Sequence, residues 1–207
     1  MSEDTGENRD VFVNCPFDGA FRPLFHVIVF TVLRCGYSPR CALEASDAGE
    51  TRIRKIARII AACPYGVHDI SRTELDEANG LPRFNMPFEL GLFLGARAFG
   101  GRQQANKQCL VLEREAYAYQ KYLSDIAGQD IYPHGDEPRE VVRHVRDFLN
   151  MLTNGVPLPG VEAILSDYDA FERGLPVVRR ELGLDENLSY SDFLWVASQF
   201  VSRDAAS

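Results

Sequence analysis

The chain has 207 residues, of which 45% are hydrophobic and 25% are charged. This is the composition of a globular protein that can bury a core, so disorder is not expected. The net charge of −8 at pH 7 argues against nucleic acid as the main partner. No apolar run reaches the roughly 18 residues of a membrane span, and the polar, acidic first ten residues are unlike a signal peptide. We therefore expect a cytoplasmic protein with no membrane partner.

Cysteine usage favours a reducing compartment. The five cysteines are an odd number and form no CxxC pair, which predicts thiols packed as small hydrophobic side chains rather than disulfides. No group of His, Cys and Asp has the spacing of metal ligands, so we expect no metal.

From the N-terminus onward, predicted strands alternate with predicted helices. Short apolar segments bounded by turn residues predict strands at 11–14, 37–44, 65–70, 107–113 and 129–132. Apolar positions at helical spacing predict helices at 23–33, 51–63, 87–99, 117–126 and 137–152. This alternation predicts an α/β fold in which helices cover both faces of a parallel five-stranded sheet.

Beyond Leu152 the composition changes. Residues 153–160 are rich in Pro and Gly and resemble a linker, and two further helices are predicted at 161–182 and 191–201. We therefore divide the chain into an α/β domain at 1–152 and, at 153–207, the linker with a C-terminal helical appendage.

Glu89 is the strongest candidate for a functional residue. The predicted helix from Pro87 to Phe99 is apolar or small at nearly every position, and a helix that is apolar all round is buried. A carboxylate is seldom buried without a partner or a purpose. In the first helical turn, the helix dipole would keep it ionised. We predict a catalytic role, as a nucleophile or as a stabiliser of a ribosyl cation; the alternative is that Glu89 only complements the dipole.

Further candidates follow the predicted strands. Parallel sheets bind ligands at the carboxyl ends of their strands, and the polar or aromatic residues there are predicted to bind substrate: Asn14, Phe17, Asp18, Asp69, Ser71, Arg72 and Asn85. Asp69 suits a sugar hydroxyl, and Ser71 and Arg72 suit a phosphate. Asp69 or Ser71 is equally compatible with capping the turn that follows the strand. Phe17 or Phe21 is suited to stacking on a base.

The order of these features resembles that of the bacterial TIR-like nucleotide-binding proteins and of the related nucleoside 2-deoxyribosyltransferases. The resemblance covers about Asp10 to Leu152 and is most specific at Phe88–Gly95, where Gly91 follows Glu89. In both groups, a glutamate on the helix after the third strand acts at an N-glycosidic bond. The resemblance implies a flavodoxin-like sheet, NAD or another nucleotide as substrate or ligand, self-association into a homo-oligomer, and a place in bacterial defence against phage.

Three functions are open at this stage. The first is an NAD glycohydrolase (NAD nucleosidase) that needs no cofactor and uses Glu89. The second is a non-catalytic nucleotide sensor, and the third is a deoxyribosyltransferase-like enzyme. The chain departs from the TIR pattern at Asn14–Asp18, where a serine and further acidic residues are usual, and from the transferase pattern at Asn85–Phe88, where an Asp-x-Gly stretch is usual.

Overall fold

A single five-stranded sheet organises the chain. The computed structural model describes residues 8–44, 47–73, 83–153 and 155–204, and all strand pairs in it are parallel. The strands are β1 (Asp10–Asn14), β2 (Ser38–Arg40), β3 (Tyr65–Asp69), β4 (Gln108–Glu113) and β5 (Ile131–Pro133). Their order in the sheet is β2-β1-β3-β4-β5. This is the flavodoxin-like order, so the predicted α/β fold is confirmed.

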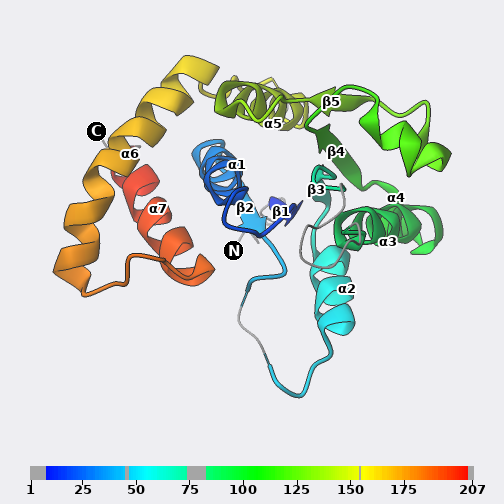
Figure 1. Cartoon of the computed structure of the whole chain (residues 1–207), viewed down its shortest axis with the longest axis horizontal. Helices are drawn as coiled ribbons and strands as arrows, with labels where there is room; N and C mark the ends of the chain where they lie inside the picture. Colours follow the sequence, from blue (N-terminus) through cyan, green and yellow to red (C-terminus); the bar gives the residue numbers. More distant parts are fainter. Residues whose placement is uncertain (1–7, 45–46, 74–82, 154, 205–207) are drawn as a thin grey trace, which may run out of the picture.

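Helices cover both faces of the sheet (Figure 1). They are α1 (Arg22–Arg34), α2 (Arg52–Ala62), α3 (Asn85–Phe99), α4 (Arg102–Ala105) and α5 (Pro138–Met151). Side chains alternate along β1, so Val11 and Val13 pack with α1 and α5, whereas Phe12 packs with α2 and α3. The sheet therefore has α1 and α5 on one face and α2 and α3 on the other.

The two C-terminal helices add a layer outside α1. Helices α6 (Val161–Leu182) and α7 (Tyr190–Asp204) lie on the α1 side of the sheet in Figure 1. Phe30 of α1 is fully buried between them, with ring centroids 5.3 Å from Phe171 and 6.0 Å from Phe200. The core under α1 therefore continues into α6 and α7.

Several element boundaries differ from the prediction. The second strand was predicted at 37–44 but ends at Arg40, whose guanidinium pairs with Glu44 (2.6 Å) and Asp10 (2.8 Å). The helix predicted at 117–126 is two short 3-10 helices, at Ala118–Lys121 and Ser124–Ile126. Helix α4 was not predicted. The central part of the predicted loop before α3, residues 74–82, lies outside the described residues.

The cysteine prediction is confirmed. All five thiols are free, and four of them, Cys15, Cys35, Cys41 and Cys63, are buried. In the ranges that the structure describes, no helix combines the length and the apolar character that crossing a membrane requires.

Candidate functional site

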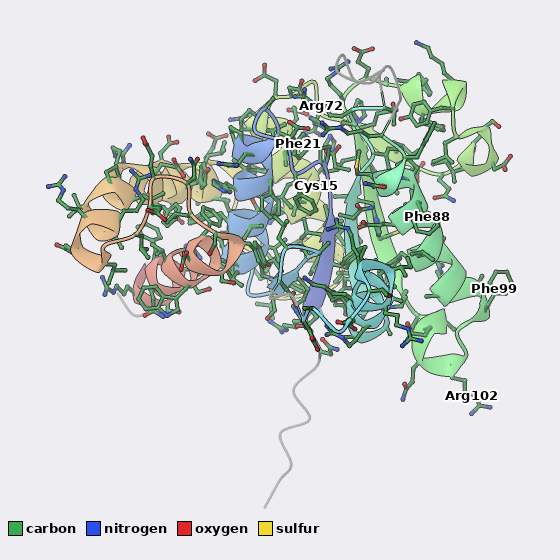
Figure 2. The ribbon with its side chains drawn as sticks, turned by 60° about the horizontal axis from the view of Figure 1, so that its bottom comes forward. Cys15, Phe21, Arg72, Phe88, Phe99 and Arg102 are labelled. Carbon is green, nitrogen blue, oxygen red and sulfur yellow. The ribbon has the colours of Figure 1, made fainter. Side chains whose placement is uncertain are left out.

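Helix α3 brings Glu89 to the carboxyl edge of the sheet. The expectation that this helix is buried all round is wrong: its buried residues are Met86, Glu89, Leu90 and Phe93. Phe88 and Phe99 point to solvent (Figure 2). Glu89 lies on the buried face, with 3% of its surface exposed. The helix begins at Asn85 rather than Pro87, so Glu89 falls outside the first turn. It therefore cannot use the free backbone N–H groups found there.

The environment of Glu89 changes its ionisation. Its Oε2 atom is buried and accepts no hydrogen bond from any residue that the structure describes. Burial raises the pKa of Glu89 to about 7, and the nearby charge of Arg52 opposes that rise. The predicted position in the first turn is therefore wrong, and burial, rather than the helix dipole, sets the direction of the pKa shift. Near neutral pH this group exchanges a proton readily, and a cation placed beside it would favour the charged form.

Glu89 lines a pocket of about 480 Å³ at this edge. Four of the predicted binding residues share the pocket with it: Asn14, Phe17, Asp18 and Asn85. Arg52 and Arg83 add two positive charges to the wall. Arg52 was not among the predicted binding residues, although its position at the first residue of α2 places it at the same edge of the sheet.

Asn14 ties the first strand to the Glu89 helix. Its Nδ2 donates to the carbonyl oxygen of Met86 (2.9 Å) and to Nδ1 of His68 (3.1 Å). Both amide hydrogens are thus used inside the protein, and only Oδ1 can face a ligand. Because Nδ1 of His68 accepts, its Nε2 carries the proton. The imidazole packs edge-on against the Phe93 ring, with the ring centroids 4.9 Å apart. Burial lowers the pKa of His68 to about 3, so the imidazole is neutral.

The β1–α1 loop is fixed by Asp18. One oxygen of Asp18 accepts from the backbone N–H of Phe21 (2.9 Å), and the other pairs with Arg83 (3.1 Å). Asp18 therefore orders the loop and holds Arg83 at the pocket. Phe17 lines the pocket while its ring packs edge-on against Phe25. Phe21 is fully buried, so the suggestion that it stacks on a base is wrong.

Three predicted binding residues, Asp69, Ser71 and Arg72, do not line the Glu89 pocket. Asp69 Oδ1 accepts from the backbone N–H of Ser71 (2.9 Å), which is the capping role that the sequence left open. Ser71 and Arg72 line a separate pocket of about 280 Å³ between the ends of β3 and β4.

The sequence analysis missed His134, which follows β5 directly and is 2% exposed. Its Nε2 lies 3.1 Å from Ser71 Oγ and 3.1 Å from Asp69 Oδ2, and the contact with Asp69 is not aligned as a hydrogen bond. The backbone N–H of Asp136 donates to Nδ1 (3.1 Å), so Nε2 carries the proton. An Nε2 that is already protonated cannot act as a base for Ser71, so this group is not a serine nucleophile with its base.

Comparisons with known proteins return no match: no protein-family model, no curated protein and no solved structure matches this chain. The resemblance to TIR-like proteins therefore stays a prediction that rests on the residues themselves. In the part of the chain that the structure describes, no three His, Cys, Asp or Glu side chains are grouped so as to hold a metal ion.

Proposed function

We propose that this chain hydrolyses the N-glycosidic bond between nicotinamide and ribose in NAD, with Glu89 as the catalytic residue. The observation that carries the proposal is the Glu89 side chain. It is a buried carboxyl group that lines a pocket, has an elevated pKa and has one oxygen without a hydrogen-bond partner among the described residues. Such perturbed carboxyl groups in clefts mark functional sites. The choice of NAD as substrate comes from the resemblance to TIR-like proteins.

The chemistry suits a single carboxylate. Water forms a bond to C1′ of the ribose, the C1′–N bond breaks, and its electron pair leaves with nicotinamide; one proton is released. The nicotinamide of NAD is cationic and leaves as a neutral molecule, so its departure needs no general acid. Positive charge develops on the ribose, and a carboxylate beside C1′ stabilises it. The cationic ring also favours the ionised form of Glu89 when NAD binds.

The other pocket residues suit the remaining parts of NAD. Arg52 and Arg83 are positioned for phosphate oxygens, Asn14 Oδ1 for a ribose hydroxyl, and the exposed part of Phe17 for an aromatic ring. The volume of about 480 Å³ falls in the range of roughly 300–1,000 Å³ that is usual for small-molecule sites.

Helix α3 also supports the proposed self-association. It begins and ends with exposed aromatic side chains, since Phe84, Phe88 and Phe99 are 53%, 56% and 90% exposed. Exposed apolar residues on one element favour contact with a second copy. A reaction that consumes NAD on assembly would suit bacterial defence against phage, which is the setting that the resemblance proposes.

The test is chromatography of NAD after incubation with the purified protein over a range of protein concentrations. We expect wild type to release nicotinamide and ADP-ribose, with a specific activity that rises with protein concentration. Glu89→Gln should lower the rate by about a hundredfold or more, as expected for a group that stabilises transition-state charge. Glu140→Gln is the control: it changes a partly exposed carboxylate on α5 that does not line the Glu89 pocket, and it should keep the activity.

The alternatives predict other products. NAD that binds at the Glu89 pocket but stays intact would overturn hydrolysis and favour the sensor. Exchange of a nucleobase between deoxynucleosides, without cleavage of NAD, would favour the transferase. Thermal melts of both variants would show whether a lost activity reflects lost folding.

A further inference from the structure

The pocket between the ends of β3 and β4 has the features of a second binding site. Its volume is about 280 Å³, and it shares no lining residue with the Glu89 pocket. Arg72 enters its wall from the β3 end and Lys121 from the turn after β4. The wall also contains Arg114, Glu113 and Glu115, and Arg114 pairs with Glu115 (3.2 Å). In a chain with a net charge of −8, a small pocket with more cationic than acidic side chains in its wall is suited to an anion.

Two buried polar atoms in its wall have no hydrogen-bond partner among the described residues. Glu113 is 2% exposed; its Oε1 accepts from the hydroxyl of Tyr122 (2.7 Å), but its Oε2 accepts from no described residue. The Nε of Arg72 is also buried, and nothing described accepts its hydrogen. An unsatisfied buried group typically costs about 1–3 kcal/mol. A ligand that accepts from Arg72 and donates to Glu113 would satisfy both.

Buried polar side chains and residues with a positive backbone φ lie around the pocket. Ser71, in its wall, contacts His134, and His134 contacts Asp69; all three residues are at most 2% exposed. Within the described ranges, the non-glycine residues with a positive φ are Arg72, Tyr117 and Asp136, which fall in the loops that follow β3, β4 and β5. Strained backbone of this kind gathers at ligand sites. Burial also raises the pKa of Glu113, because it removes water from the carboxylate. A ligand that donates a hydrogen bond to the carboxylate would replace part of that lost hydration.

We propose that this second pocket binds a phosphate-bearing small molecule of mononucleotide size or less. Arg72 and Lys121 hold the phosphate, and Glu113 accepts a hydrogen bond from a hydroxyl or amino group of the ligand. The volume of about 280 Å³ is below the usual range for sites of larger ligands, which excludes a whole dinucleotide. The inference does not rest on the proposed NAD cleavage, because none of these residues lines the Glu89 pocket.

Isothermal titration calorimetry with three probes tests the proposal: inorganic phosphate, ribose 5-phosphate and AMP. Lys121 is exposed, so Lys121→Glu should preserve the fold and should weaken binding by roughly tenfold or more. Arg102→Glu is the matched control, because Arg102, the first residue of α4, is exposed and lies far from Arg72 in Figure 2. It should leave binding unchanged. Glu113→Gln should reduce the preference for AMP over inorganic phosphate.

The probes also separate possible sources of the phosphate. Equal affinity for all three would assign the site to the phosphoryl group alone, whereas tighter AMP binding would assign it to a nucleoside phosphate; both outcomes support an anion site. Absence of binding by every probe, or binding that Lys121→Glu leaves unchanged, would overturn the proposal. Loss of NAD binding at the Glu89 pocket in Lys121→Glu would overturn the independence of the two pockets. None of these outcomes depends on whether NAD is cleaved.

Discussion

At the scale of single residues, the decisive feature is that burial outweighs the helix dipole at Glu89. A carboxylate gains about 0.3–1 kcal/mol near a helix N-terminus, and that gain fades beyond the first turn. Removal from water acts more strongly and in the opposite direction. The result is a carboxyl group whose pKa is raised to about 7, which makes its protonation sensitive to the pH range in which cells work.

The ionisation of Glu89 predicts a pH-dependent stability. Its pKa rises from the ordinary 4.5 to about 7 on folding, so between these values the folded state holds a proton that the unfolded state has lost. The contribution of Glu89 to the free energy of unfolding should therefore fall as pH rises from about 4.5 to 7, and stay level above. Glu89→Gln removes this loss. The difference in the free energy of unfolding between Glu89→Gln and wild type should therefore be larger at pH 8 than at pH 4.5, in favour of the variant, by roughly 1–3 kcal/mol.

Urea unfolding at a series of pH values measures this difference. Asp185→Asn, which removes an exposed carboxylate, controls for the general loss of a negative charge and should change stability by less than about 0.5 kcal/mol at each pH. A difference between Glu89→Gln and wild type that does not vary with pH would contradict the raised pKa. The same ionisation predicts that kcat/KM for NAD cleavage rises with pH through about 7, because the carboxylate is the active form.

At the scale of elements, α2 shows how a helix face is chosen. Its isoleucines are not equivalent: Ile59 is fully buried against Phe12 and Phe93, whereas Ile53 is 44% exposed. Lys55 is buried instead, and its Nζ donates to the carbonyl oxygen of Glu44. The long stem of a lysine covers apolar surface while its ammonium group reaches an acceptor, which allows Lys55 a place on the inner face.

This arrangement predicts unequal costs for the same substitution. Ile59→Ala should reduce the free energy of unfolding by about 2–5 kcal/mol, because it leaves a cavity in the core. Ile53→Ala on the same helix should change it by less than about 0.5 kcal/mol. Chemical denaturation of both variants measures the difference. Equal effects would mean that the helix presents another face to the sheet.

The elements that sequence predicted well are those with a strong local pattern. Helix α6 occupies its predicted range, and β1, β3 and α5 lie within a residue or two of theirs. Errors arose where tertiary contacts decide. The segment after Arg40 has strand-like residues, but the pairing of β2 with β1 stops at Arg40, whose guanidinium pairs with Asp10 of β1. Four predicted binding residues share the Glu89 pocket, whereas Ser71 and Arg72 line another. Two pockets at one edge cannot be separated by spacing along the chain.

At the scale of the whole molecule, the sheet and the C-terminal helices share one buried core. Phe171 of α6 is 2% exposed, and its ring lies within 6 Å of those of Phe30, Phe193 and Phe200. Tyr190 of α7 donates from its hydroxyl to the carbonyl oxygen of Pro39 in β2 (2.7 Å). Contacts of this kind couple the stability of α6 and α7 to that of the sheet.

Coupled unfolding is the expected consequence. The single tryptophan, Trp195, lies on α7, so its fluorescence reports the C-terminal helices while far-UV circular dichroism reports the whole chain. Both signals should give one coincident transition in wild type. Phe171→Ala should shift both midpoints together, with a loss of about 3–5 kcal/mol, whereas Val177→Ala, at a half-exposed position of the same helix, should shift neither. A fluorescence midpoint that falls while the main dichroism transition stays in place would mean that the C-terminal helices unfold independently. Independent unfolding of these helices would expose the Phe30 side chain to water while the sheet stays folded. The burial of Phe30 against Phe171 and Phe200 argues against that outcome.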